Sequence, residues 1–405
     1  MLTATASLYK KAFNGLSRNT WYLSFVMLVN RSGTMVIPFM TMYCTQQLHF
    51  SLPQAGVVVA LFGAGAITGA YVGGRITDKF GFYSQQFASL LLGGCMFIVT
   101  GFLHTYLSLC IGTFILSFCN ESFRPANAAA IAYYSNAENR TRSYSLNRLA
   151  INLGWAVGGA LGGLLASINY HLLFWVDGST NIFAALLLFK LLPYANTRAS
   201  VVKEKPVTSQ RAYSDKFYVA FIIITFFFAS CFFQLFTMQP VFFKTQWHFN
   251  EAFIGFLMAI NGIIIVFSEM VLVYSIEGKK ADTFFIRIGF FIAAISFATL
   301  NILQPGAITA ILSISLITIG EMLSMPFMNS FCIQRSALHN RGEYTALYAM
   351  AWSLAQIAAP LSGSYIAASY GFATLWWLLT VICVCTSISI FLLEKKIKSS
   401  QPAII

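Results

Sequence analysis

The chain has 405 residues, of which 58% are hydrophobic and 9% are charged. A soluble domain carries about 25% charged residues, so the composition excludes a soluble globular protein and indicates a membrane protein. The formal net charge is +12, but the basic residues form no basic face or nucleic-acid-binding module, so we expect no nucleic-acid partner.

Apolar runs separated by polar breaks predict an all-α membrane protein with twelve transmembrane helices. Each run approaches or exceeds the ~20 residues that one crossing needs. The first run is too long for the apolar core of a signal peptide. The predicted spans are 19–46, 53–74, 83–104, 106–134, 144–167, 170–193, 217–243, 252–275, 283–303, 306–333, 344–369 and 371–393.

The long polar connection at residues 194–216 divides the chain into two six-helix bundles, 1–193 and 217–405, joined by a cytoplasmic linker. With both termini in the cytoplasm, Lys244 is the one basic residue on an outer loop. Arg31 and Arg124 lie within spans, and the remaining Lys and Arg residues lie on inner segments. This asymmetry fixes the expected orientation, because cytoplasmic loops are rich in Lys and Arg.

The two halves resemble each other at a nearly constant offset. His49 and Phe50 align with His248 and Phe249 at an offset of 199 residues. Further along the chain, Pro125 aligns with Pro326 at an offset of 201. We interpret this as a parallel six-helix repeat, related by an axis along the membrane normal.

Twelve spans in two similar halves, with a long inner linker, resemble the major facilitator superfamily over nearly the whole chain. The segment from Gly74 to Gly81, GRITDKFG, resembles the family's signature between spans 2 and 3. The resemblance implies a conformational latch on the inner side, although Phe82 and Tyr83 replace the usual basic pair. The alternative is a tight turn with solvated charges. The predicted latch residues are Gly74, Asp78, Lys79, Gly81, Arg140 and Arg142.

Span 5 has a glycine pattern that resembles a motif of drug–proton antiporters, with Gly159 at the position of the usual Pro. Pro360 and Gly363 are the counterpart in the second half. Glycines four residues apart also permit close helix packing, which is the alternative reading. The predicted packing residues are Gly154, Gly158, Gly162, Gly163, Pro360 and Gly363.

A weaker similarity connects Arg124–Pro125 and residues 151–154 to the proton-dependent oligopeptide transporters. Their acidic signature in span 1 is missing here, where Arg31 is the one matching residue. The sequence therefore favours the drug–proton antiporter branch over the peptide transporters.

Charged residues at membrane depth are costly and usually face a cavity or a partner. The resemblance implies that spans 1, 4, 7 and 10 line a central cavity, with Glu121 and Arg124 on one wall of an asymmetric site and Glu321 opposite. The alternative for Arg31 and Glu121 is a buried pair that fixes helix packing. The predicted substrate-binding residues are Arg31, Glu121, Arg124, Glu321, Gln234 and Gln239.

Glu321 is the first candidate for proton coupling, because burial would bring its carboxyl group into the titration range of working pH. Glu121, Asp177 and Glu269 are further candidates. Asp177 has an equally good structural reading, and Glu269 could instead meet a cation of an inner loop.

These features predict a secondary active transporter that moves a small amphiphilic or zwitterionic solute by alternating access, with proton-coupled export. One alternative is a proton-coupled importer of peptides or other zwitterions. A distant alternative is a non-transporting receptor or lipid-handling protein. We expect no enzyme activity, no metal and no cofactor beyond the proton. We expect a monomer in the lipid bilayer of the cell membrane, either a bacterial inner membrane or a plasma membrane.

Overall fold

Long apolar runs fold into helices throughout the part of the chain that the computed structural model describes, which is residues 15–136, 139–194, 212–276, 278–336 and 340–400. These ranges contain no strand. Lipid offers no hydrogen-bond partner to backbone N–H and C=O groups, whereas a helix satisfies them within one segment. The predicted all-α architecture is confirmed.

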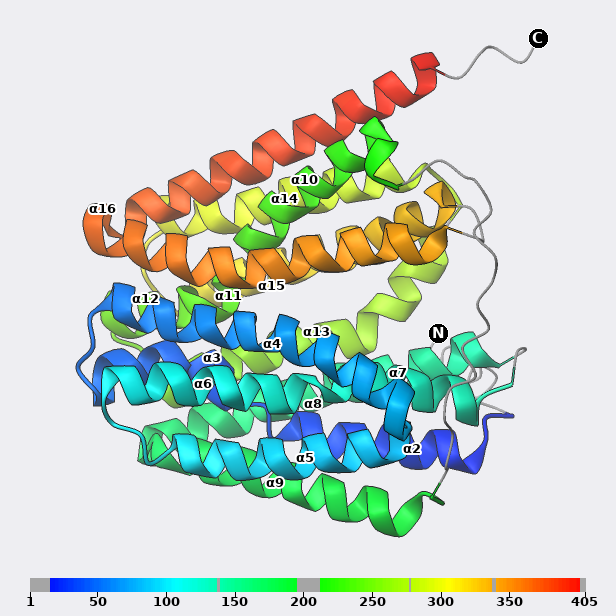
Figure 1. Cartoon of the computed structure of the whole chain (residues 1–405). Helices are drawn as coiled ribbons and strands as arrows, with labels where there is room; N and C mark the ends of the chain where they lie inside the picture. The colour runs from blue at the N-terminus through cyan, green and yellow to red at the C-terminus, as the bar shows by residue number, and fades with distance from the viewer. Residues whose placement is uncertain (1–14, 137–138, 195–211, 277, 337–339, 401–405) are drawn as a thin grey trace. The chain divides into compact units, whose positions relative to one another are not determined.

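Eleven helical stretches of the described residues are long and apolar enough to cross a membrane, and the first ten overlap the first ten predicted spans. The eleventh, Glu343–Ile397, has 55 residues, more than twice the ~20 that one crossing needs. At Gly371 its backbone leaves the helical conformation, with φ 84° and ψ 162°. The two arms that meet there, orange and red in Figure 1, match the predicted spans 344–369 and 371–393.

The described residues form two compact units, which are separated at positions 202/203, 248/249 and 266/267. The first unit contains α2 (Arg18–Ser32), α3 (Val36–Met42), η1 (Tyr43–Gln47), α4 (Leu52–Phe80), α5 (Phe82–Thr100), α6 (Tyr106–Glu121), α7 (Phe123–Tyr134), α8 (Arg140–Ile168), α9 (His171–Leu191) and the beginning of α13 (Glu251–Ile276).

The second unit contains η2 (Ala212–Ser214), α10 (Lys216–Phe232), α11 (Gln234–Thr237), α12 (Gln239–Thr245), the end of α13, α14 (Asp282–Ile302), α15 (Ala307–Arg335) and α16 (Arg341–Ser400). The predicted halves follow the sequence repeat and not these packing units, so the division at residues 194–216 stays a prediction.

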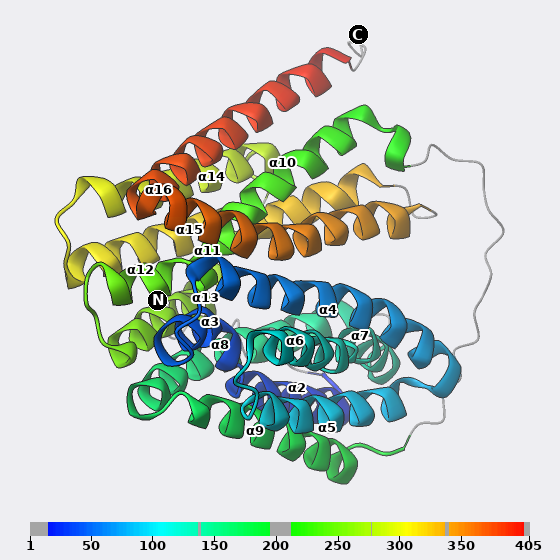
Figure 2. The ribbon, with the colours of Figure 1, turned by 60° about the vertical axis from the view of Figure 1, so that its left-hand side comes forward.

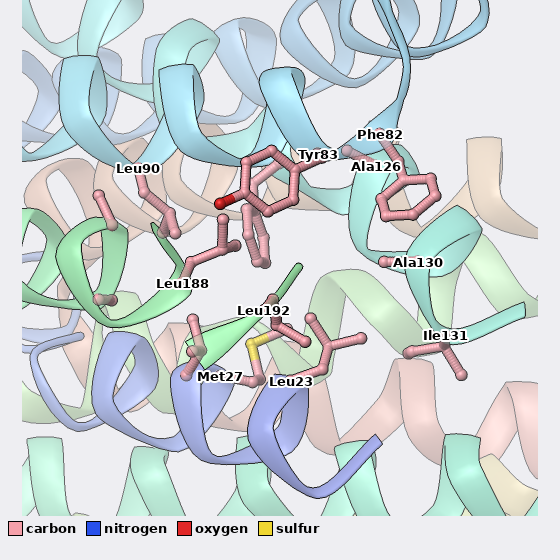
Figure 3. Packing of buried hydrophobic residues seen from close by; sticks show 14 of the residues in the cluster. Leu23, Met27, Phe82, Tyr83, Leu90, Ala126, Ala130, Ile131, Leu188 and Leu192 are labelled. Carbon is pink, nitrogen blue, oxygen red and sulfur yellow. The ribbon is translucent and has the colours of Figure 1, made fainter. Parts of the chain in front are cut away.

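A cluster of buried apolar side chains joins α2, α5, α7, α8 and α9 of the first unit (Figure 3). Leu23 of α2, Phe82 of α5, Ala130 of α7 and Leu188 of α9 belong to it, and none is more than 4% exposed. Because lipid tails are as apolar as these side chains, close packing and not exclusion from water holds such helices together.

A row of glycines brings α4 against α6 and the start of α7. Gly65, Gly69 and Gly73 follow one another at four-residue spacing on α4, which lies alongside α6 (Figure 2). A Cβ atom added at Gly73 would lie 2.6 Å from the carbonyl oxygen of Ser122. The backbones therefore touch, and this row is a packing feature that the sequence analysis did not include.

The first, fourth and seventh predicted spans are broken helices. The first is divided between α2 and α3, the fourth between α6 and α7, and the seventh among α10, α11 and α12. Pro38, Pro125 and Pro240 follow within a few residues of these breaks. Proline has no N–H group, and its ring displaces the carbonyl four residues earlier, so it favours an interruption there.

The repeat is visible in the backbone as well as in the sequence. His49 and His248, which are 199 residues apart, have φ angles of 56° and 55°. They are the two non-glycine residues with positive φ in the described ranges. Since a positive φ is uncommon for a side-chain-bearing residue, its recurrence at this offset supports the similarity of the two halves.

Candidate functional site

Three charged side chains of the first unit meet beside two helix breaks. Arg31 lies at the end of α2, Glu121 at the end of α6, and Arg124 at the start of α7. The Nη1 atom of Arg31 is 3.8 Å from Oε1 of Glu121, and the Nε atom of Arg124 is 2.5 Å from Oε2 of Glu121. The structure therefore brings together these three residues of the predicted substrate site.

This charged cluster carries one positive charge in excess. Glu121 and Arg31 are buried, whereas the side chain of Arg124 is 60% exposed. The Nδ2 atom of Asn120 donates a hydrogen bond to Oε1 of Glu121 at 3.1 Å. The buried Nε atom of Arg31 has no hydrogen-bond partner among the described residues. Of the two guanidinium groups, that of Arg124 is accessible to a further anionic group.

Asp177, a predicted coupling residue on α9, is held by backbone and amide groups. Its carboxylate accepts hydrogen bonds from the backbone N–H groups of Met35 and Val36 and from the side chain of Asn181. Asp177 is 1% exposed and forms no ion pair with a described residue. Its predicted part in proton coupling stays a prediction.

Side-chain amides form a second buried network, on α5, α7 and α8. The Nε2 atom of Gln86 donates to Oδ1 of Asn127 at 3.3 Å, and Nδ2 of Asn127 donates to Oδ1 of Asn147 at 3.4 Å. All three residues are buried. The sequence analysis missed this network, for which the available signal was the presence of amides within apolar runs.

The remaining predicted binding and coupling residues belong to the second unit or to the end of α13. Gln234 and Gln239 are both 1% exposed. Gln234 donates to the carbonyl oxygen of Ala359 at 2.8 Å, and Gln239 donates to the hydroxyl of Ser313 at 3.3 Å.

Two carboxylates of that part of the chain are half-buried. Glu321 follows Gly320 on α15, where a Cβ atom added at Gly320 would lie 2.7 Å from the carbonyl oxygen of Gly289 on α14. Glu269 lies on the last part of α13. The roles of both residues in binding or coupling stay predictions.

The predicted latch lies at the end of α4. Gly81 has a φ of 87° and ends the helix, so this turn requires glycine. Asp78 is exposed, and Lys79 extends over the ring of Phe80 at 5.1 Å. Asp78 pairs with no described side chain.

The other latch residues lie nearby in sequence or on α8. A Cβ atom added at Gly74 would lie 3.8 Å from the Cβ atom of Pro125. Arg142 is half-buried. The side chain of Arg140 lies outside the described part, so its pairing with Asp78, and the latch itself, stay predictions.

The predicted packing glycines of α8 form two rows on different faces. One row contacts the break of the first span: a Cβ atom at Gly154 would lie 2.5 Å from Cβ of Arg31, and one at Gly158 would lie 2.9 Å from the carbonyl oxygen of Thr34. Gly162 continues this row, and a Cβ atom added there would lie 2.7 Å from the Cβ atom of Met35.

The other row of α8 contacts the start of α13. A Cβ atom at Gly163 would lie 2.6 Å from the Cα atom of Gly255. Beside this contact, the hydroxyl of Tyr170 donates to Oε1 of Glu251 at 2.9 Å. Burial, together with the nearby Glu251 carboxylate, raises the pKa of Tyr170, so its hydroxyl keeps the proton that it donates.

In the second unit, Gly363 leaves room for a polar side chain. A Cβ atom at Gly363 would clash with the amide oxygen of Gln234, which is fixed by its bond to Ala359. Pro360, one residue after Ala359, lies inside the helix α16. Gly363 thus lets α16 approach α11, and the packing role of Pro360 stays a prediction.

The chain is similar to known transporters along most of its length. It is 23% identical over 376 residues to the uncharacterized MFS-type transporter YhjO of Bacillus subtilis, covering 91% of each chain. It is 28% identical over 241 residues to the class H tetracycline resistance protein of Pasteurella multocida, covering 56% of this chain and 57% of that one. It is 26% identical over 196 residues to multidrug resistance protein 1 of Bacillus subtilis, covering 47% and 49%.

Solved structures share the fold at low sequence identity. A POT family transporter in complex with 5-aminolevulinic acid has a TM-score of 0.78 at 15% identity and covers 95% of this chain and 98% of its own. The nucleoside transporter NupG has a TM-score of 0.76 at 16% identity, covering 94% and 100%. The model of the Major Facilitator Superfamily matches residues 21–360. The chain therefore belongs to the Major Facilitator Superfamily and is a multi-pass membrane transporter of small molecules.

Proposed function

We propose that the protein exports a small amphiphilic or zwitterionic organic solute by alternating access, in exchange for protons. The observation that carries the proposal is the cluster of Arg31, Glu121 and Arg124. Two guanidinium groups and one carboxylate are held together at two helix breaks, where a single pair would have sufficed for packing. Irregular backbone at membrane depth is typical of transporter binding sites.

Both signs of charge limit the cargo. A site for purely cationic drugs would be expected to hold carboxylates without guanidinium groups, whereas Arg124 is 60% exposed and has donors available for an anionic group. Glu121 can interact with a positive group of the same solute. Relatives named for tetracycline and multidrug resistance support export of organic molecules.

For the proton, we propose Glu321 as the principal carrier. Glu121 is held by two arginines, which favours its charged form, so it is a less suitable proton carrier. Glu269 and Asp177 are further candidates. Neutral variants of each carboxylate separate these roles, because glutamine and asparagine do not carry the proton.

The second candidate function is proton-coupled import of peptides or other zwitterions. It is favoured by the fold similarity to POT family transporters, one of which is in complex with 5-aminolevulinic acid. Against it stands the first span, which has Arg31 but no carboxylate beside it. A receptor or lipid-handling protein that moves no solute is the distant alternative.

Transport by purified protein in liposomes tests the proposal. Tetracycline, 5-aminolevulinic acid and a dipeptide serve as probes, with an imposed pH gradient of either sign. Export by exchange predicts that an acidic lumen drives tetracycline into the liposomes while protons leave. Import by symport predicts instead that an acidic exterior drives uptake of the dipeptide or 5-aminolevulinic acid. Wild-type liposomes that behave like protein-free liposomes in every case would contradict both functions.

Two variants connect the transport result to the site. Glu321→Gln is expected to abolish coupling to the gradient while downhill exchange of the probe continues. Arg31→Ala is expected to weaken binding of the probe. We further propose that the protein lies in the cell membrane and acts as a monomer. Size-exclusion chromatography with light scattering measures the oligomeric state directly.

A further inference from the structure

The break in the first span is held from both sides by polar groups of α9. Before the break, the Nδ2 atom of Asn30 donates to Oδ1 of Asn181 at 2.7 Å. After the break, the N–H groups of Met35 and Val36 donate to Oδ2 of Asp177 at 3.4 and 3.3 Å. We call Asp177 and Asn181, with these contacts, the polar bridge.

The two members of the polar bridge are themselves joined. The Nδ2 atom of Asn181 donates to Oδ1 of Asp177 at 3.1 Å and to the carbonyl oxygen of Asp177 at 2.8 Å. Asn30, Asp177 and Asn181 are each at most 3% exposed. The hydrogen bonds among these side chains are therefore made within the protein and not with water. This matters because a buried polar group without a partner is costly.

The bridge answers a specific requirement of the break. The first N–H groups of a helix have no partner within the helix. Met35 and Val36, at the start of α3, are 0% and 1% exposed, so water does not satisfy their N–H groups. The N–H of Met35 also donates to the carbonyl oxygen of Gly33 at 2.7 Å, so the carboxylate of Asp177 matters most for the N–H of Val36, the first residue of α3.

Arg31 lies between the two ends of the bridge. It is one residue after Asn30 and four before Met35. On its other side the backbone of α8 approaches so closely that a Cβ atom at Gly154 would lie 2.5 Å from Cβ of Arg31. The break, and Arg31 with it, is thus confined between α9 and α8.

We propose that Asp177 is a positioning residue of the solute site, which acts through Arg31 by fixing the break of the first span. This inference rests on the proposed function for its transport readout, but the bridge itself does not. It assigns Asp177 a role that is distinct from carrying the coupling proton, since its carboxylate is engaged by backbone and amide donors.

The first experiment measures amide hydrogen exchange of peptides that cover residues 30–42, in wild type, Asp177→Ala and Thr180→Val. Thr180 is the matched control, because its hydroxyl bonds carbonyl oxygens of its own helix and valine keeps its volume against Gly33. Asp177→Ala is expected to raise the rate of amide exchange in this segment about tenfold, because the variant loses a hydrogen bond to a charged group. Equal exchange in wild type and Asp177→Ala would overturn the bridge.

The second experiment measures tetracycline transport in liposomes for Asp177→Ala and Asp177→Asn, each with Arg31 and with Arg31→Ala. With Arg31 present, Asp177→Ala is expected to raise KM about tenfold with kcat nearly unchanged. An asparagine side chain keeps one acceptor oxygen. Asp177→Asn is therefore expected to have a KM close to that of wild type and to retain proton coupling. With Arg31→Ala, the further change at Asp177 is expected to leave KM where it is.

The outcomes separate the two proposals. An equal rise of KM in both backgrounds would show that Asp177 does not act through Arg31. Loss of proton coupling in Asp177→Asn with KM unchanged would make Asp177 a proton carrier and overturn the positioning role. Wild-type protein that moves no probe would contradict the proposed function, while the exchange experiment would still decide the polar bridge.

Discussion

The charged cluster makes a quantitative prediction for Glu121→Gln. In this variant the buried guanidinium of Arg31 loses the only carboxylate with which it pairs among the described residues. At 3.8 Å and an effective dielectric constant of about 20, the attraction between two unit charges is about 4 kcal/mol. Local rearrangement recovers part of it, so we expect the free energy of unfolding to fall by about 3 kcal/mol, the usual cost of breaking a buried pair.

The assay is unfolding of the detergent-solubilised protein by titration with SDS, followed by tryptophan fluorescence. Arg124→Gln is the matched control, because its exposed guanidinium is expected to contribute less than about 1 kcal/mol. The rescue variant combines Glu121→Gln with Arg31→Met, which removes the uncompensated buried charge and is expected to be more stable than Glu121→Gln alone.

Two results would refute this reasoning. One is a Glu121→Gln variant as stable as wild type. The other is a double variant whose loss equals the sum of the two single losses, because additive effects mean that the two side chains do not interact.

Three further predictions concern other parts of the chain. Asp215 accepts two hydrogen bonds from Arg335, at 2.7 and 3.0 Å; although burial alone raises its pKa, the bonds from Arg335, the backbone and Tyr344 lower it overall. Asp215→Asn is therefore expected to cost about 1–2 kcal/mol at neutral pH. The difference from wild type, measured by thermal unfolding across pH, should be fully present above the ordinary aspartate pKa of about 4 and vanish as the pH falls through the lower folded pKa. Gly163→Val would press against the backbone at Gly255 and is expected to cost about 3 kcal/mol and to slow transport, read by unfolding and liposome flux. Gly371→Ala meets no neighbour but has a φ of 84°, so we expect a loss of about 1–3 kcal/mol from backbone strain alone; an unchanged midpoint would contradict it.

Hydropathy predicted the spans because it reports directly which segments lipid accepts. It also separated the two arms of α16, which meet at Gly371. It could not place the breaks, since a proline such as Pro326 lies inside a helix while Pro125 follows an interruption. The break depends on whether neighbouring helices supply partners for the freed backbone groups, and this is a tertiary property.

The cost of charges at membrane depth marked Arg31, Glu121 and Arg124, and the sequence analysis placed Glu121 and Arg124 on one wall of the site. The alternative of a buried Arg31–Glu121 pair describes the other part of the geometry, but the structure was needed to show that both arginines meet the same carboxylate. The polar bridge was not predictable, because Asp177 accepts from backbone N–H groups, which nearly every residue possesses and no sequence pattern reveals.

The two glycine rows of α8 have a mechanical consequence. Side chains between helices yield by changing rotamer, so they absorb small displacements before passing them on. At Gly154 and Gly163 the helix α8 contributes no side chain, and its backbone touches the Arg31 segment on one face and the backbone of α13 on another. A shift of α13 at Gly255 therefore reaches the Arg31 segment through the main chain of α8, with no side chain of α8 at either contact to absorb it.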